Sequence, residues 1–112
     1  MPEKPTGASA QGASAVYRCG TLTLNAATGV VLVGDEPVAL TRTEYAILKL
    51  FMRNPGLVLA KAAVLDRIGA DTPDCTESSL KTHVSHLRAK LRRAGGEVRI
   101  ESVWGIGFRL KT

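Results

Sequence analysis

The chain has 112 residues, of which 45% are apolar and 4% aromatic, with two cysteines and a formal net charge of +5. This length and apolar content suit a single domain whose core needs no disulfide or metal. Cys19 and Cys75 match no metal-ligand spacing, so free thiols are expected. No signal peptide and no apolar run of bilayer length is recognisable, which predicts a cytoplasmic protein that does not enter a membrane.

The excess positive charge lies in the last third of the chain. Residues 1–75 carry seven Lys or Arg and seven Asp or Glu, whereas residues 76–112 carry eight basic and three acidic residues. Basic residues gathered in one helix and one hairpin indicate a face that binds a polyanion. A solvated basic surface that serves solubility is the alternative left open by charge alone.

The N-terminal part of the chain divides into a linker and a strand-rich segment. Residues 1–15 consist mostly of Pro, Gly, Ser and Ala, and are expected to form a flexible linker or a cloning remnant. The folded domain is therefore expected at residues 16–112. Alternation and β-branched residues at 17–40 predict three or four short antiparallel strands.

Two helices are expected after these strands. Thr41 and Glu44 match a capping box, with Thr41 as the N-cap of a strongly apolar helix that stops at residues 54–56, NPG. A second helix is predicted at about residues 60–68, with Gly69 as its C-cap.

The remaining elements are the longest helix and a terminal hairpin. Asp74 and Thr76 are both acceptable N-caps for a helix at about residues 76–93. Residues 98–111 are expected to form a β-hairpin that turns at the sequence WGIG.

The faces of the third helix separate on a helical wheel at about 100° per residue. The predicted buried stripe consists of Leu80, Val84, Leu87 and Leu91. The opposite face holds Ser78, Thr82, Ser85, His86, Ala89 and Arg93, and the flanks hold Lys81, Arg88 and Arg92 on one side and His83 and Lys90 on the other. Beyond Glu77 the helix carries no acid, whereas surface helices commonly mix Glu with Lys. Small polar side chains between cations suit a helix in the DNA major groove.

The two histidines of this helix need separate consideration. His83 and His86 are three residues apart, with no third ligand and no paired nucleophile, which argues against a metal site and against catalysis. No cofactor is predicted. His86 lies on the exposed face, where it can meet a base edge, and His83 on the flank suits a phosphate contact or packing.

Three motifs in order resemble the winged-helix effector domain of OmpR/PhoB-type response regulators. Residues 40–68, LTRTEYAILKLFMRNPGLVLAKAAVLDRI, are similar to the opening helix, turn and second helix of that family. Residues 78–91, SSLKTHVSHLRAKL, resemble its recognition helix, and residues 100–110, IESVWGIGFRL, resemble its wing.

The resemblance implies an α+β fold, a winged helix-turn-helix with an N-terminal four-stranded antiparallel sheet, a three-helix bundle and a C-terminal β-hairpin wing. It implies sequence-specific binding of duplex DNA for transcriptional regulation, as the output domain of a two-component system. The recognition helix would enter the major groove and the wing the adjacent minor groove, on a direct-repeat operator. A phosphorylated receiver domain upstream and its sensor kinase are implied partners that these residues do not contain.

The resemblance also implies roles for individual residues. Lys61 falls at a position that contacts a DNA phosphate, and the positions of Ser79, His83 and Arg88 contact the DNA backbone. The positions of Thr82, Ser85 and His86 face the groove. Ser102 and Trp104 fall on the wing. The helical wheel adds Ser78, Lys81 and Arg92, and alternation along the last strand adds Arg109 and Lys111 as cationic contacts. Trp104 has an alternative, which is packing on the third helix.

Other functions are weighed against DNA binding. A winged helix that binds only proteins would tolerate acids on its third helix, and an RNA binder would need exposed aromatics, for which Trp104 is the candidate. An enzyme is disfavoured because no phosphate loop or nucleophile elbow is recognisable. The loop at residues 69–74, with Asp71 and Asp74, is either an RNA polymerase contact, as the resemblance implies, or a simple capped connector.

Overall fold

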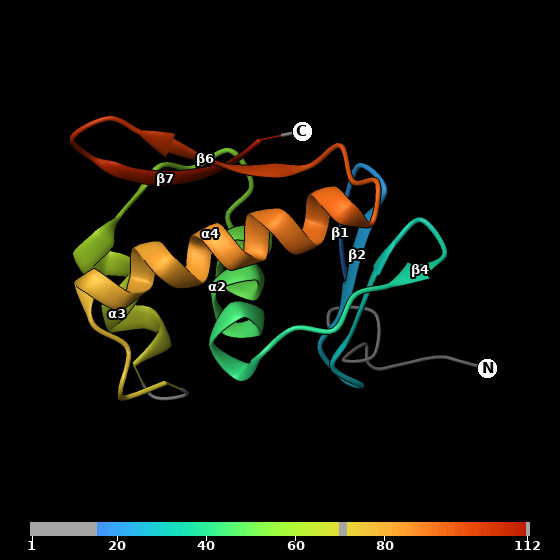
Figure 1. The fold of residues 1–112 in the computed structure, drawn as a ribbon, viewed down its shortest axis with the longest axis horizontal. Coiled ribbons are helices and arrows are strands. Elements are labelled where there is room, and N and C mark those ends of the chain that lie inside the picture. The colour runs from blue at the N-terminus through green and yellow to red at the C-terminus, as the bar shows by residue number, and fades with distance from the viewer. Residues whose placement is uncertain (1–15, 70–71, 112) are drawn as a thin grey trace.

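The computed structural model describes residues 16–69 and 72–111, so the predicted linker at residues 1–15 lies outside the described part. The elements follow the expected order of sheet, helices and hairpin (Figure 1). The predicted α+β winged helix-turn-helix architecture is confirmed.

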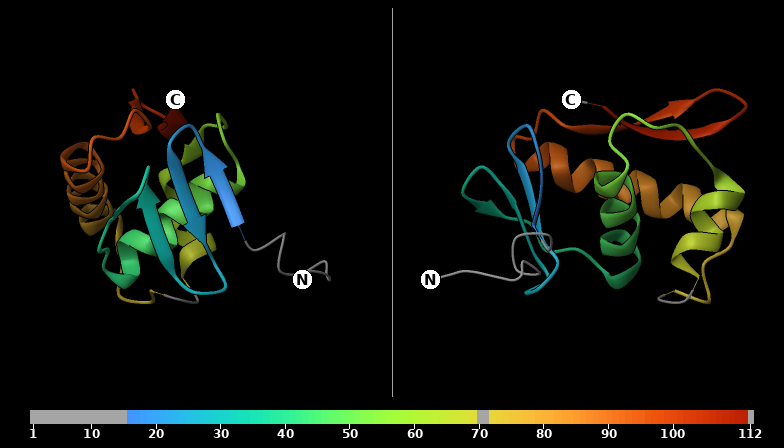
Figure 2. Two further views of the ribbon diagram at one scale, coloured as in Figure 1. Left: turned by 90° about the vertical axis from the view of Figure 1, so that its right-hand side faces the viewer. Right: turned by 180° about the vertical axis from the view of Figure 1, so that it is seen from behind.

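The N-terminal sheet is an antiparallel meander of four short strands. Its strands are β1 (Val16–Cys19), β2 (Leu22–Asn25), β3 (Val30–Val33) and β4 (Glu36–Pro37), and each pairs with the next. Alternate residues of β2 and β3 are buried, so one face of the sheet closes the core. Figure 2 shows the helices behind that face.

The helix α2 (Arg42–Arg53) begins at the predicted capping box. The backbone N–H of Glu44 donates to the Thr41 hydroxyl at 3.2 Å, and the N–H of Thr41 donates to the Glu44 carboxylate at 3.0 Å. The two bonds satisfy donors that the first turn of a helix leaves without partners.

The second helix lies where the sequence predicts it, and a short strand precedes it. The helix α3 (Lys61–Ile68) starts after a two-residue strand, β5 (Leu59–Ala60), which was not predicted. Gly69 is the C-cap, as predicted, and its backbone stays helical with a φ of −57°. The strand β5 forms because β7 offers it an edge, and local sequence carries no signal for that pairing.

The helix α4 (Glu77–Arg93) is capped by Thr76, which decides between the two N-caps that the sequence left open. The wing follows as β6 (Arg99–Val103) and β7 (Gly107–Lys111). A three-stranded sheet forms in the order β5-β7-β6, so the wing is joined to the start of α3. In Figure 1 this sheet runs alongside α4.

A single aliphatic cluster holds the domain together. It joins the inner face of the N-terminal sheet to the three helices and the wing, with Phe51 of α2 fully buried at its centre. All four residues of the predicted α4 stripe belong to this cluster and are at most 2% exposed: Leu80, Val84, Leu87 and Leu91. Their burial sets the rotation of α4 and therefore which of its side chains face solvent.

Candidate nucleic-acid interface

The first turn of α4 is stabilised by a reciprocal cap between Thr76 and Ser79. The N–H of Ser79 donates to the Thr76 hydroxyl at 3.2 Å, and the N–H of Thr76 donates to the Ser79 hydroxyl at 2.8 Å. Ser79 therefore already accepts one hydrogen bond within the cap, a role that the sequence analysis did not assign to it.

None of the residues predicted to contact DNA is buried. The exposed ones are Lys61, Ser78, Lys81, Thr82, Ser85, His86, Arg92, Ser102 and Trp104, and the half-buried ones are Ser79, His83, Arg88 and Arg109. One cleft between α3, α4 and the wing is lined by Lys61, Lys81, Ser85, Arg88, Ser102 and Trp104, together with Glu77. Arg109 does not line it and lies at a separate pocket beside Pro55 and Gly56. The remaining α4 residues continue along the exposed face of the same helix.

The side chain of Arg88 connects α4 to the wing. Its Nε donates to the backbone oxygen of Ile100 at 2.5 Å, and its Nη2 donates to the hydroxyl of Ser102 at 2.8 Å. A guanidinium has five N–H donors, so Arg88 retains donors for a phosphate while it positions β6. Two residues predicted separately as DNA contacts are thus a bonded pair.

The cations of β7 are partly neutralised within the wing. Arg109 hydrogen-bonds to one oxygen of Glu101, and the ammonium of Lys111 lies 3.5 Å from the other oxygen. The hydrogen bond from Arg109 and the charge of Lys111 hold the pKa of Glu101 below its ordinary value. The predicted alternation with the buried Phe108 and Leu110 is confirmed, but Glu101 weakens the positive charge of this strand.

The tip of the wing is a tight turn that presents two apolar side chains. The N–H of Ile106 donates to the oxygen of Val103 at 3.0 Å, and Gly105 takes a φ of +74° between them. Trp104 is 96% exposed and Ile106 is 58% exposed. The alternative in which Trp104 packs against α4 is therefore wrong, because the turn directs the indole into solvent.

Comparison with known proteins decides the family. The sequence profile described as "Transcriptional regulatory protein, C terminal" matches residues 35–110. The chain belongs to this family. The winged-helix domain is 35% identical over 101 residues to the response regulator MprA of Mycolicibacterium vanbaalenii, with 89% of this chain and 43% of that protein covered. It is 33% identical over 99 residues to the transcriptional regulatory protein CreB of Escherichia coli, with 88% of this chain and 43% of that protein covered.

Solved structures give the same assignment. The AdeR DNA-binding domain in complex with an intercistronic region superposes with a TM-score of 0.76 at 26% identity, covering 86% of this chain and 98% of that one. The Klebsiella pneumoniae RstA DNA-binding domain in complex with the RstA box has a TM-score of 0.71 at 27% identity, covering 84% and 94%. The resemblance to OmpR/PhoB-type effector domains is confirmed, and the chain spans less than half the length of the curated relatives.

One buried ion pair of the winged-helix domain was not predicted. The ammonium of Lys90 donates to Glu44 at 2.5 Å, and Nδ1 of His86 lies 4.0 Å from the other carboxylate oxygen. Burial by itself would raise the pKa of Glu44, but the hydrogen bonds from Lys90 and Thr41 and the charge of Lys90 leave it below its ordinary value. Lys90 binds the same carboxylate oxygen that accepts the capping hydrogen bond from Thr41, and the 46 positions between Lys90 and Glu44 leave no local signal of this contact in the sequence.

The described residues offer neither a cluster of metal ligands nor a membrane-spanning helix. Within residues 16–69 and 72–111 of the winged-helix domain, no group of three or more His, Cys, Asp or Glu side chains could hold a metal ion. Among the helices of the same ranges, none has the length and apolar character of a membrane span.

Proposed function

We propose that this domain binds duplex DNA with α4 in the major groove and the wing, residues 98–111, at the adjacent minor groove. The observation that carries the proposal is the exposed face of α4, which bears no carboxylate beyond Glu77 and lies beside the wing. Sequence-specific DNA binding for transcriptional regulation is the function that the family membership supports.

The two kinds of DNA contact fall on different parts of this surface. Lys61, Lys81 and Arg92 are exposed cations around the helix face and suit phosphates. Their contribution would be independent of sequence and sensitive to salt. Ser78, Thr82, Ser85 and His86 project from the face itself and suit base edges. Ser102 and Trp104 would meet the minor groove.

A mobility shift with matched nucleic acids tests the proposal. Duplex DNA from a random pool should be retarded, whereas single-stranded DNA and RNA of equal length should bind more weakly. If RNA bound as tightly as duplex DNA, an RNA-binding function would be favoured. If no nucleic acid bound, a winged helix that contacts only proteins would be favoured.

The substitution Arg88→Ala sharpens the test. It should weaken binding to every duplex and lower the slope of log affinity against log salt by about one, because one phosphate contact is lost. Arg88→Lys is the matched control, since it retains the charge and the slope but loses the planar fork that holds Ile100 and Ser102. An unchanged slope in Arg88→Ala would assign Arg88 to the wing alone.

The longer relatives support partners beyond DNA. We infer that a receiver domain precedes this domain in the intact protein and that a sensor kinase phosphorylates the receiver domain. We also infer that the intact protein acts in the cytoplasm. The loop at residues 69–74 would contact RNA polymerase. Asp71 lies outside the described residues, and Asp74 is exposed and does not cap α4.

This loop has its own test in the intact regulator. Asp71→Ala should leave DNA affinity unchanged and lower transcription from the bound promoter, with Asp66→Ala on α3 as the control acid. If neither affinity nor transcription changed in Asp71→Ala, the loop would be a connector only.

A further inference from the structure

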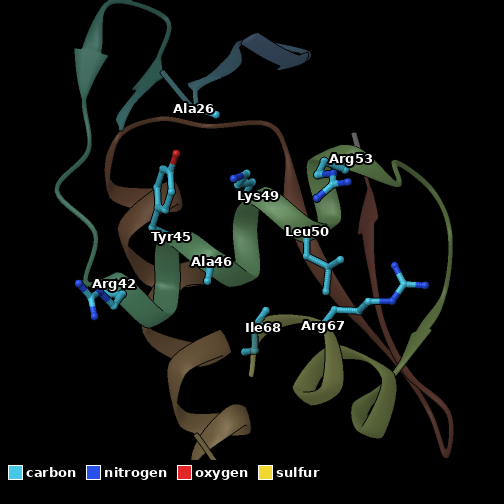
Figure 3. A pocket seen from close by; sticks show the side chains of 9 residues that line it. All are labelled: Ala26, Arg42, Tyr45, Ala46, Lys49, Leu50, Arg53, Arg67 and Ile68. Atoms are coloured by element: carbon cyan, nitrogen blue, oxygen red, sulfur yellow. The ribbon is translucent and has the colours of Figure 1, made fainter. Parts of the chain in front are cut away.

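A second group of cations lies on α2, away from the candidate DNA interface. Arg42, Lys49 and Arg53 follow one another along a single face of this helix, and Arg67 comes from the last turn of α3 (Figure 3). These are four of the seven basic residues in the charge-neutral first 75 residues. The fold therefore brings four cations together into a local excess of positive charge, although the first 75 residues have no net charge.

The four cations surround a groove with a volume of about 450 Å³. Its inner wall consists of the buried side chains of Ala46, Leu50 and Ile68. We name this the α2 groove. Since residues 42 and 53 are eleven positions apart on a helix, its row of charge is about 16 Å long. That length exceeds a single phosphate or carboxylate and suits several anionic groups in a row.

The cations of the α2 groove form no ion pair with another residue of the ranges 16–69 and 72–111. Every ion pair within these ranges uses Glu44 or Glu101, and Glu44 is engaged with Lys90 of α4. Lys49 and Arg53 are four residues apart on one helix face, an arrangement of like charges that disfavours the helix. The helix dipole favours Arg53 and Arg67, which lie in the last turns of α2 and α3, but it gives no reason for Arg42 and Lys49 in the same row.

The position of the α2 groove separates it from bound DNA. Seen from behind in Figure 2, α2 lies in front and α4 on the far side. A duplex on the exposed face of α4 would leave the groove open. The α2 groove is concave, its rim is cationic and its base is partly apolar. We propose that it binds an acidic protein segment, with Asp or Glu side chains along one face, while the domain is bound to DNA.

A designed peptide probes this site directly. The probe is a fluorescein-labelled helical peptide with Glu at every third or fourth position, and the same peptide with Gln is the neutral control. In fluorescence anisotropy, Lys49→Gln/Arg53→Gln should weaken binding of the Glu peptide about fivefold, as expected for two exposed ion pairs. Its melting temperature and duplex affinity should remain those of the unchanged protein.

The matched control is Arg92→Gln/Arg93→Gln, which removes the same charge from α4. It should weaken duplex binding and leave the Glu peptide bound. Equal loss of the peptide in both double variants would overturn the proposal, because net charge alone would then attract it. Loss of duplex affinity in Lys49→Gln/Arg53→Gln would also overturn it, by assigning the groove to DNA. The peptide measurement needs no DNA, so it stands whether or not duplex binding is found.

Discussion

Glu44 links the start of α2 to the last turn of α4 through its carboxylate. One oxygen accepts from the Thr41 N–H at 3.0 Å and from the Lys90 ammonium at 2.5 Å, and the other faces His86. Only 2% of the Glu44 side chain is exposed, whereas 32% of Lys90 is. The buried carboxylate therefore depends on its partners, and Lys90 can retain part of its hydration.

We expect Glu44→Gln to lower the free energy of unfolding by about 1–3 kcal/mol near neutral pH, because a charged hydrogen bond and half of the capping box are weakened. The lowered pKa of Glu44 means that its contribution is complete above the unfolded-state pKa and is lost as pH falls through the folded-state pKa. Urea unfolding at about pH 7 and about pH 3 should show the two proteins converge in acid.

Lys90→Gln is the control for this pair. It should also destabilise the domain near neutral pH, although the capping box stays intact, because the buried Glu44 carboxylate loses its charged partner. If the gap between Glu44→Gln and the unchanged protein stayed constant from neutral to acid pH, the charge of Glu44 would have no role in stability.

The position of His86 predicts a sequence-dependent effect on binding. Its side chain is 63% exposed on the face of α4 that would meet bases. His86→Ala should cost about 1–3 kcal/mol on the preferred duplex and little on random DNA. His83→Ala, on the half-buried flank, should weaken both duplexes to a similar extent. Equal losses in His86→Ala would show that His86 does not read bases.

At the scale of elements, the wing is built on a contact that needs glycine. Gly107 pairs with Ala60 of β5, and a Cβ on Gly107 would lie 2.0 Å from the backbone oxygen of Leu59. Such a distance cannot be accommodated without moving one strand. The second glycine of the WGIG turn is therefore required by β5, a strand that lies almost fifty residues away along the chain.

Gly107→Ala should destabilise the domain by about 1–3 kcal/mol, because the added methyl group forces β5 and β7 apart. Chemical unfolding would measure the loss, and duplex affinity should fall as the wing moves. Gly105→Asn is the control, since Asn tolerates a positive φ and no atom lies within 4 Å of the new Cβ. Equal stability of Gly107→Ala and the unchanged protein would refute the close approach.

At the scale of the whole molecule, the fold distributes charge over two faces. The exposed face of α4 and the wing form one, and the α2 groove on the other side of α2 forms the second. The sequence predicted the first face because the net positive charge lies in residues 76–112, whereas the first 75 residues carry equal numbers of acidic and basic residues. A ligand on one face leaves the other accessible.

Selection of bound duplexes from a random pool tests how whole domains assemble on DNA. We expect two half-sites of the same polarity, spaced by about one helical turn, because the family resemblance implies head-to-tail binding. Half-sites in opposite polarity would instead indicate a two-fold symmetric dimer. A single half-site would indicate that this domain binds alone.

Features that depend on short-range interactions could be predicted from the sequence. The capping box of Thr41 and Glu44, the apolar stripe of α4 and the alternation of β7 all depend on residues within a few positions of one another. Periodicity and caps are therefore readable before any folding is considered. They were sufficient to predict the order of strands, helices and hairpin and the faces of α4, whereas the winged-helix assignment came from the resemblance of three motifs to a known family.

Only the tertiary structure decided which distant side chains meet. Lys90 reaches Glu44 across 46 positions, Arg88 holds Ser102 across 14, and β5 exists because β7 lies beside it. Such contacts depend on how helices and strands pack, and packing is set by the whole core, not by local pattern. The same packing exposes Trp104, ties Arg109 to Glu101 and assembles the α2 groove.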